Sequence, residues 1–360
     1  MKSSTNVLDL PVYAYSRARS AGFTLEYLLL QSFSYLIPSF LTGGSAKGMP
    51  KPPKLDIKTI QAIRAELLDL LREDSRHMAQ GEYPILVVTP ESPLRHFTRI
   101  PVLLADAFSI HRRRARGKTT EFDAQARDFL SELPRYYRRN FHFQTSGYLS
   151  KRSAEVYEHQ VELLFQGCAD AMRRLILSRL KKRFGDSDGE GLRFLEIGAG
   201  TGRATRFVHL TFPKAKIIAV DLSDPYLKVA QRNLSGFPRI DFMQGDGAHL
   251  PFKDEEFDAV YSVFLFHELP KAAREEVISE SLRVLKKDGF LGLVDSLQTG
   301  DKKLFDPLLQ HFPKAFHEPF YREYISSPME DLLKKQGFTE IESGTGFTSK
   351  VCTALKRSTA

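Results

Sequence analysis

The sequence predicts an α/β domain whose mostly parallel sheet has helices on both faces, preceded by a mainly helical region. After Gly191, short apolar runs alternate with amphipathic segments, which is the pattern of a parallel sheet with crossover helices. Before Gly185, apolar residues recur at helical spacing, most clearly over residues 57–71. A chain of 360 residues is long enough for two units, which we place at 55–188 and 189–360.

Residues 1–54 are expected to form an apolar segment that ends in a Gly- and Pro-rich linker at 43–54. The apolar run at 27–41 is interrupted by serines and a proline and is too short to cross a bilayer. Its position does not suit an ordinary secretory signal. Three roles stay open: membrane-surface contact through residues 20–41, docking on a partner, or a transit peptide, since acids are scarce before Asp56.

The extension that follows is expected to be mainly helical and to cap the substrate. A helix begins near residue 55, and an irregular stretch with several prolines follows over 84–101. An aromatic cluster at 136–148 precedes Ser150, which we expect to cap one long helix with an apolar stripe over 156–176. The polar segment 185–191 marks the boundary to the α/β domain.

Composition and charge limit the class of protein. Apolar residues make up 42% and charged residues 27% of the chain, which excludes a disordered or membrane-spanning class. Cys168 and Cys352 lie far apart, so we expect no disulfide framework, no metal site and a reducing compartment. We therefore expect a cytoplasmic protein, with membrane association or an organellar location as alternatives.

Much of the formal net charge of +8 comes from two basic clusters. Such clusters can bind nucleic acid or an anionic membrane, but more often they are solvated helix faces. No RNA-binding motif accompanies them, so we favour solvated faces and no nucleic-acid partner. Their members are Arg112, Arg113, Arg114, Arg116 and Lys118, then Arg173, Arg174, Arg179, Lys181, Lys182 and Arg183.

Strands and helices alternate in the α/β domain. The expected strands are 193–197, 215–221, 240–244, 257–263 and 290–294. The expected helices are 203–210, 225–234 and 271–285. Ligands of such sheets bind at the carboxyl ends of the strands, where the winding reverses.

The first strand ends in a turn with glycines at alternate positions, Gly198, Gly200 and Gly202. Such glycines let the backbone turn sharply and approach a ligand closely. A dinucleotide motif would place its third glycine one residue later, where Arg203 stands. The turn therefore favours a cofactor without a pyrophosphate and disfavours a nicotinamide-dependent oxidoreductase.

Carboxylates follow the next two strands. Asp221 stands about 20 residues after the glycine turn, where a carboxylate can accept hydrogen bonds from both hydroxyls of a ribose. Asp246 could accept a hydrogen bond from an adenine amino group, with the apolar residues 250–252 against the ring. Three such features at the ends of three successive strands rarely coincide by chance.

Residues 192–354 resemble the class I S-adenosylmethionine-dependent methyltransferases, particularly small-molecule enzymes of the ubiquinone and menaquinone biosynthesis type. The matching residues are Glu196, Gly198, Gly200, Gly202, Asp221, Gly245, Asp246, Leu250, Pro251, Phe252, Phe257, Asp258 and the run 283–290. The resemblance implies S-adenosylmethionine as cofactor and a Rossmann-like, seven-stranded sheet whose last strand, near 351–355, is antiparallel. Residues 140–150 resemble the extension of an uncharacterised bacterial and algal methyltransferase branch, which implies no substrate.

The resemblance implies that the glycine turn lies near the methionyl part of the cofactor, Asp221 at the ribose and Asp246 near the adenine. The expected cofactor contacts are Glu196, Gly198, Ala199, Gly200, Gly202, Asp221, Leu222, Asp246, Gly247 and Val263. His267 and Glu268, after the fourth strand, are the expected catalytic residues. His267 could be a general base, because its reference pKa is near neutral pH, or it could only order its loop.

The segment after the fifth strand is expected to be an insert that closes over the active site and lines a substrate pocket. The alternative is a satellite hydrophobic cluster. Its polar and aromatic members are Asp295, Ser296, Asp301, Phe305, His311, Phe312, Phe316, His317, Glu318, Phe320, Tyr321 and Tyr324. We expect His317 and Tyr321 to contact the substrate from this side, and Phe143 and Tyr148 from the opposite wall.

The leading hypothesis is methyl transfer to an oxygen, nitrogen or carbon nucleophile of a small molecule. Nucleic-acid methylation is an alternative, although residues 266–269 lack the Asn/Asp-Pro-Pro-aromatic motif of enzymes that methylate base amino groups. A catalytically silent scaffold is a third hypothesis, but such a scaffold would not need Asp221 and Asp246.

Overall fold

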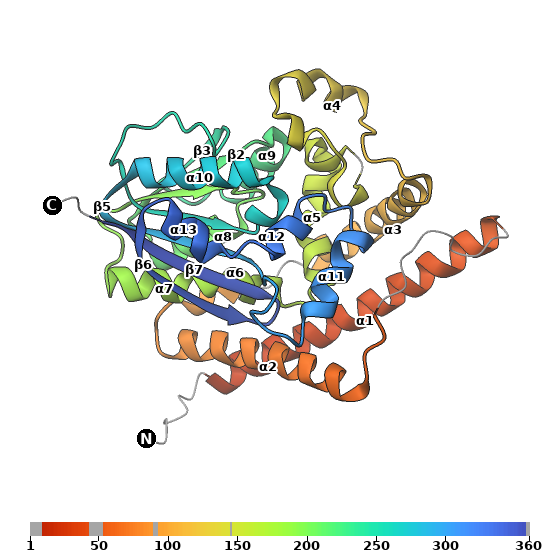
Figure 1. Cartoon of the computed structure of the whole chain (residues 1–360). Helices are drawn as coiled ribbons and strands as arrows, with labels where there is room; N and C mark the ends of the chain where they lie inside the picture. Colours follow the sequence, from red (N-terminus) through yellow and green to blue (C-terminus); the bar gives the residue numbers. More distant parts are fainter. Residues whose placement is uncertain (1–8, 43–52, 89–92, 145, 358–360) are drawn as a thin grey trace.

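The computed structural model describes residues 9–42, 53–88, 93–144 and 146–357, so most of the expected linker lies outside the described residues. Within them, a seven-stranded sheet has the order β3-β2-β1-β4-β5-β7-β6 (Figure 1). The strands are β1 Arg193–Ile197, β2 Lys216–Asp221, β3 Ile240–Gln244, β4 Phe257–Val263, β5 Leu285–Ser296, β6 Phe338–Gly346 and β7 Ser349–Lys356. β7 is antiparallel to β5 and β6, and the other pairs are parallel. This confirms the predicted fold class and the antiparallel last strand.

The sequence located every strand except β6. In β6 the residues 339–345 include two glutamates, two threonines and a serine, and several are exposed. An edge strand tolerates polar side chains because it contacts the core over a smaller area, so its hydrophobic signal is weak. The strand β5 is longer than expected, since it begins at Leu285, directly after α10.

Helices cover both faces of the sheet because alternate strand residues point to opposite sides. Phe194 and Ile217 pack with α7 (Leu175–Phe184) and α8 (Arg203–Thr211) on one face. Leu195 and Ile218 pack with α10 (Lys271–Val284) on the other. Figure 1 shows α10 above the sheet and α7 below it. The helix α9 (Asp224–Asn233) follows β2.

The N-terminal region is helical, as predicted, and packs on the α/β part. The helix α1 (Asp9–Thr42) contacts α2 (Ile57–Ala79), α3 (Pro93–Arg116) and α5 (Lys151–Leu164). The expectation of an irregular stretch over 84–101 was wrong for its second half, because α3 begins at Pro93 and continues through Pro101. Pro93 fits the first turn of this helix, where the missing N–H of a proline has no partner to lose, whereas Pro101 lies inside the helix.

Shorter elements complete the described chain. Before the sheet they are η1 Ile85–Val88, α4 Ala124–Phe129, η2 Leu130–Glu132, η3 Arg135–Tyr137, η4 Phe141–Phe143, η5 Gly147–Leu149 and α6 Ala169–Arg173. Within the sheet domain they are η6 Phe266–Glu268, α11 Asp306–Ala315, α12 Tyr321–Ile325 and α13 Met329–Lys335.

The single long helix expected after Ser150 is broken. Ser150 does cap α5, since its Oγ accepts a hydrogen bond from the N–H of Ser153. The chain then turns at Gln166 and Gly167, which both have positive φ. A Cβ on Gly167 would lie 3.0 Å from atoms of Phe23 and Ser20, so the close approach of α1 requires glycine here.

The second basic cluster is a solvated face only in part, since Lys182 and Arg183 are exposed but its first two arginines are not. Arg173 and Arg174 are each only 4% exposed. Two hydrogen bonds of 2.9 and 2.6 Å join the Arg174 guanidinium to the carboxylate of Asp74, and Arg173 pairs with Asp170 and Glu158. Both arginines therefore neutralise buried acids and cannot face a polyanion.

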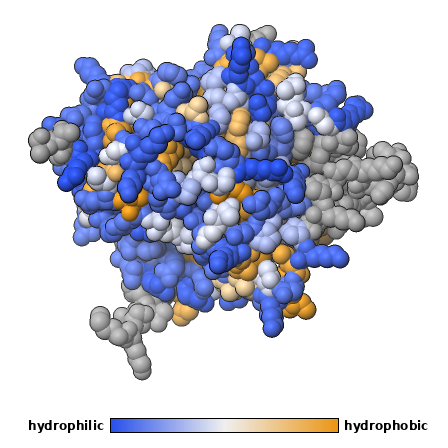
Figure 2. Space-filling view, in the orientation of Figure 1, coloured by the Kyte–Doolittle hydropathy of each residue, from blue (hydrophilic) through white to orange (hydrophobic). Residues whose placement is uncertain are grey.

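On the face shown in Figure 2, hydrophilic residues cover most of the surface, and hydrophobic residues lie in small groups among them. Among the described helices, none combines the length and apolar character needed to cross a membrane. One buried hydrophobic cluster joins Leu67 and Leu71 of α2 to strand residues such as Leu293. The core is therefore shared across residues 185–191, and the division at that segment stays a prediction.

Candidate active site

The glycine turn forms one wall of a cavity of about 990 Å³ that is partly open to solvent. Gly198 and Gly200 adopt φ values of +76° and +56°, which disfavour other residues. A Cβ on Gly198 would lie 3.0 Å from Leu265, whereas a Cβ on Gly200 would meet nothing within 4 Å. A Cβ on Gly202 would lie 2.8 Å from Leu234, so this glycine allows helix packing and does not line the cavity.

Asp221 fixes the turn from the end of β2. Its Oδ2 accepts a hydrogen bond of 2.7 Å from the N–H of Gly200, and its Oδ1 accepts one of 2.7 Å from the N–H of Ser223. Burial raises the pKa of the carboxyl to about 6, against the effect of these backbone donors. The buried charge is therefore incompletely compensated, and the carboxylate can accept further hydrogen bonds from the cavity.

Glu196 and Asp246 also line this cavity. Burial raises the pKa of Glu196 to about 7, although its carboxylate accepts hydrogen bonds from the hydroxyls of Thr205 and Tyr261 at 2.5 and 2.9 Å. Asp246 accepts a hydrogen bond of 3.0 Å from the N–H of Ala248. These contacts fix both side chains at the ends of their strands.

The structure brings together nearly all of the expected cofactor residues. Those that line the cavity are Glu196, Gly198, Ala199, Gly200, Asp221, Leu222, Asp246, Gly247 and Val263. Residues 250–252, expected against an adenine ring, do not line it, because Leu250 is buried in the core and Phe252 packs edge-on against Phe257 at 5.0 Å. Tyr136, Leu269 and Val277 supply apolar surface instead.

A second cavity, of about 770 Å³, lies beside the first, and Tyr157, Phe264 and Glu268 line both. Tyr321 lines the second cavity and Tyr148 the first. Phe264 has a φ of +59°, an uncommon conformation for an aromatic residue that often marks a functional site. The two cavities therefore adjoin at Tyr157, Phe264 and Glu268, of which Glu268 is the ionisable residue.

Two of the expected substrate residues are not placed at these walls. The side chain of Phe143 lies outside the described part of the structure. His317 lines neither cavity, and burial together with the nearby Arg139 lowers its pKa. The wall opposite the insert is formed instead by Tyr137, Phe141 and Tyr148, and the rings of Phe141 and Tyr148 stack at 5.4 Å.

His267 is held as an imidazolium. Its Nδ1 lies 2.6 Å from Asp295 Oδ1, while Asp295 Oδ2 accepts a 2.7 Å hydrogen bond from the N–H of Phe266. Burial opposes the positive charge, but the Asp295 carboxylate outweighs it and raises the pKa of His267 to about 10. His267 thus carries its proton at neutral pH.

Glu268 belongs to a second charged group, which the sequence did not reveal. Its Oε1 accepts a hydrogen bond from the hydroxyl of Tyr148, and His142 Nε2 lies 3.5 Å from the same oxygen. The other ring nitrogen of His142 lies 3.0 Å from the fully buried Glu318. Burial raises the pKa of Glu318 to about 7, while the neighbouring His142 lowers it. Only the acidic and histidine residues amid the aromatic segments hinted at this group.

Known protein families and sequences match this chain in its sheet domain. A family model described as a methyltransferase domain matches residues 194–289. An uncharacterized methyltransferase of Synechocystis sp. is 33% identical over 151 residues, which are 42% of this chain and 68% of that protein. A demethylmenaquinone methyltransferase of Lactobacillus johnsonii is 30% identical over 154 residues, or 42% of this chain and 60% of that protein.

Among solved structures, phosphoethanolamine N-methyltransferase 2 of Haemonchus contortus in complex with S-adenosyl-L-methionine has a TM-score of 0.40. It is 20% identical and covers 51% of this chain and 52% of that one. This chain spans between 60% and 68% of the length of the two sequence relatives named above.

Proposed function

Because this chain belongs to the class I S-adenosylmethionine-dependent methyltransferases, we propose that it transfers a methyl group to a small molecule. The acceptor atom is an oxygen, nitrogen or carbon. The observation that carries the proposal is the meeting of the two cavities at Glu268, which gives the donor and the acceptor separate but adjoining spaces. The relative named for demethylmenaquinone supports the small-molecule class.

The residues of the first cavity fit an adenosyl sulfonium donor. Gly200 leaves open space where a side chain would stand, and Asp221 keeps acceptor capacity beside it. Asp246 and the apolar surface of Leu269 and Val277 would hold the adenine. The bound donor supplies an electrophilic methyl group, and its positive charge suits a cavity with several carboxylates.

Glu268 is the proposed proton acceptor when the acceptor molecule must lose a proton. His267 cannot take this role at neutral pH, because Asp295 keeps it protonated. Glu268 faces both cavities, and its Oε1 is already positioned by the hydroxyl of Tyr148. The imidazolium of His267, whose Nε2 lies 3.8 Å from Glu268, would orient this carboxylate.

The test is methyl transfer from isotope-labelled S-adenosylmethionine to small molecules that co-purify with the full chain, identified by mass spectrometry. Glu268→Gln should lower the transfer rate while the affinity for S-adenosylhomocysteine stays unchanged. Glu275→Gln, which removes a carboxylate in an exposed ion pair with Lys335, is the matched control. A chain that binds the donor but methylates only nucleic acid, with steep salt dependence, would contradict the proposal.

Peripheral membrane contact through residues 20–41 is a separate proposal. Leu25, Leu28 and Leu29 of α1 are more than half exposed, which supports it because exposed leucines on one helix favour an apolar surface. Cosedimentation with anionic vesicles should fall when Leu25 and Leu29 are replaced by glutamate. Equal cosedimentation of this variant would refute the contact.

A further inference from the structure

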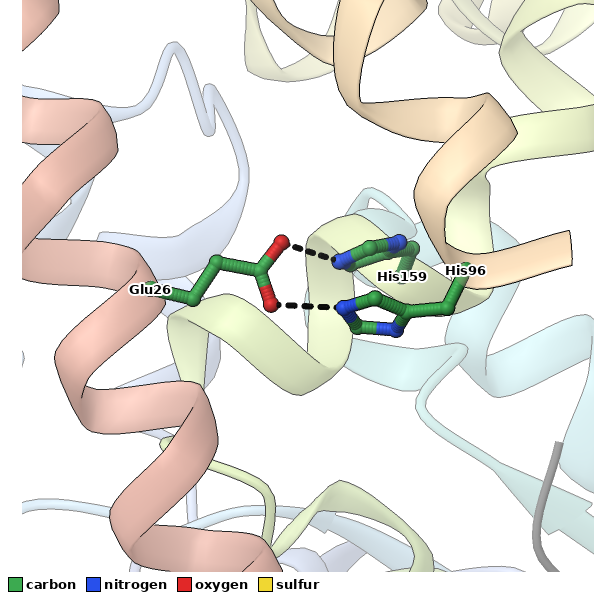
Figure 3. Close-up of side chains that lie close together, drawn as sticks. All are labelled: Glu26, His96 and His159. Atoms are coloured by element: carbon green, nitrogen blue, oxygen red, sulfur yellow. Dashed lines mark hydrogen bonds and ion pairs between the residues drawn. The ribbon is translucent and has the colours of Figure 1, made fainter. Parts of the chain in front are cut away.

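Three helices of the N-terminal region bring one carboxylate and two imidazoles together (Figure 3). Glu26 comes from α1, His96 from α3 and His159 from α5. Glu26 Oε2 lies 2.9 Å from His96 Nε2, and Glu26 Oε1 lies 2.8 Å from His159 Nε2. The ligand atoms of all three side chains lie within 4.8 Å of one another. We propose that these residues bind a divalent zinc ion that fastens α1 to α3 and α5.

The donor set favours zinc over harder cations. Two imidazole nitrogens and one carboxylate oxygen are common zinc ligands, whereas magnesium and calcium prefer oxygen alone. Zinc bonds of about 2.0–2.2 Å place neighbouring ligand atoms roughly 3.3 Å apart in a tetrahedron. The separations of 2.8 and 2.9 Å involve different oxygens of Glu26, and with one ligand atom from each side chain the three atoms lie within 4.8 Å of one another. Ligand atoms would therefore need to move by at most about 1.5 Å to reach the tetrahedral spacing.

The two imidazoles are held in the orientation that such a site requires. Their ring centroids lie 4.2 Å apart with an interplanar angle of 31°, and both Nε2 atoms point toward Glu26 (Figure 3). The ring of Phe23 packs edge-on against His96 and His159, at 5.7 and 5.8 Å. Because packing already restricts these rings, metal binding would cost little additional conformational entropy.

The site is buried but reachable. His159 is 2% exposed, whereas the side chains of Glu26 and His96 are 16% and 27% exposed. Both histidines line a cavity of about 1830 Å³ that opens to solvent. Water from this cavity could complete a four-coordinate ion, and the same opening lets the ion enter.

No local pattern of residues reveals this site, because Glu26 lies 70 residues from His96 and 133 from His159. Its role would be structural. His159 follows Glu158, whose carboxylate accepts a hydrogen bond from Thr201 in the glycine turn. An ion at Nε2 of His159 would therefore help to fix the helix that supports one wall of the donor cavity.

The test uses the full chain, stripped of metal and titrated with zinc in competition with a fluorescent chelator. We expect one equivalent of zinc to bind and to raise the melting temperature, and we expect His96→Gln to weaken binding at least 100-fold. The matched control is His77→Gln, because His77 pairs with Glu82 at 2.8 Å and this pair belongs to no three-ligand group within the described ranges, so the change should leave zinc affinity unchanged.

The variant His96→Cys distinguishes a metal site from a group of three side chains that is joined only by hydrogen bonds. A thiolate can replace an imidazole as a zinc ligand, so this variant should recover zinc binding and the zinc-dependent rise in melting temperature. Failure of the wild type to bind one equivalent of zinc would overturn the proposal. Equal affinity in the wild type and in His96→Gln would also overturn it.

Discussion

Removal of the charge at Asp221 should weaken donor binding strongly. In the structure each carboxylate oxygen already accepts one backbone N–H at 2.7 Å, from Gly200 and from Ser223. Asparagine keeps one of these oxygens and replaces the other by an NH₂ group, which cannot accept. A hydrogen bond to a charged group contributes about 1.5–3 kcal/mol, so each one lost should weaken binding by roughly 10- to 100-fold.

The pH dependence gives a second, independent readout. Since burial raises the pKa of Asp221 to about 6, the free protein becomes protonated there as the pH falls below 6. The protonated form must lose its proton to accept hydrogen bonds from both ribose hydroxyls. Affinity should therefore fall about tenfold for each pH unit below 6 in the wild type. In Asp221→Asn this part of the pH dependence should disappear.

Isothermal titration calorimetry with S-adenosylhomocysteine between pH 5 and pH 8 measures both effects. Asp224→Asn is the matched control. The Asp224 carboxylate lies only three residues further along the chain but forms a surface ion pair with Lys228, so its loss should leave donor affinity unchanged. Melting temperatures of the variants establish that each is folded. If Asp221→Asn binds as tightly as the wild type at pH 7.5, the role of this carboxylate is refuted.

Three further perturbations test the rest of the site and the fold. Glu268→Gln should lower the rate of methyl transfer by about 10²–10⁴-fold without changing donor affinity, if the acceptor loses a proton. An equal single-turnover rate constant would rule out the proton-acceptor role. Asp295→Asn should lower the pKa of His267 from about 10. Because a raised pKa in the folded state stabilises the fold at pH values below the unfolded pKa, the part of the melting-temperature loss that depends on pH should be largest below pH 6.5 and disappear as the pH rises through 10. Arg174→Met should destabilise the fold by about 3–5 kcal/mol in urea unfolding, because it leaves the buried Asp74 without a counter-charge; a change below 1 kcal/mol would contradict the buried ion pair.

Much of the donor cavity could be predicted because its residues follow local patterns. A strand that ends in glycines, and two later strands that end in Asp221 and Asp246, are visible in a few residues each. The sheet then brings them together, since parallel strands carry their carboxyl ends to one edge. Gly202 belongs to the same pattern yet faces Leu234, because the pattern records backbone conformation and not the direction of the cavity.

The acceptor side could not be predicted in the same way. His142, Glu268 and Glu318 come from three segments far apart in sequence, and their protonation depends on burial and on mutual charge. A histidine in a sequence has a reference pKa near neutral pH, but the Asp295 carboxylate moves that of His267 to about 10. For this reason the proposed mechanism assigns the role of base to the neighbouring Glu268 and not to His267.

The sequence by itself determined the positions of most strands along the chain and the glycine turn, because these depend on local spacing and composition. The identity of the donor followed from the family resemblance that these local motifs carry. Only the tertiary structure decided where the helix after Ser150 breaks, that Arg173 and Arg174 are buried, and that Glu26 meets two histidines. These features depend on contacts between helices distant in sequence, and on the loss of solvent around charged groups. Neither leaves a periodic signal in the order of the amino acids.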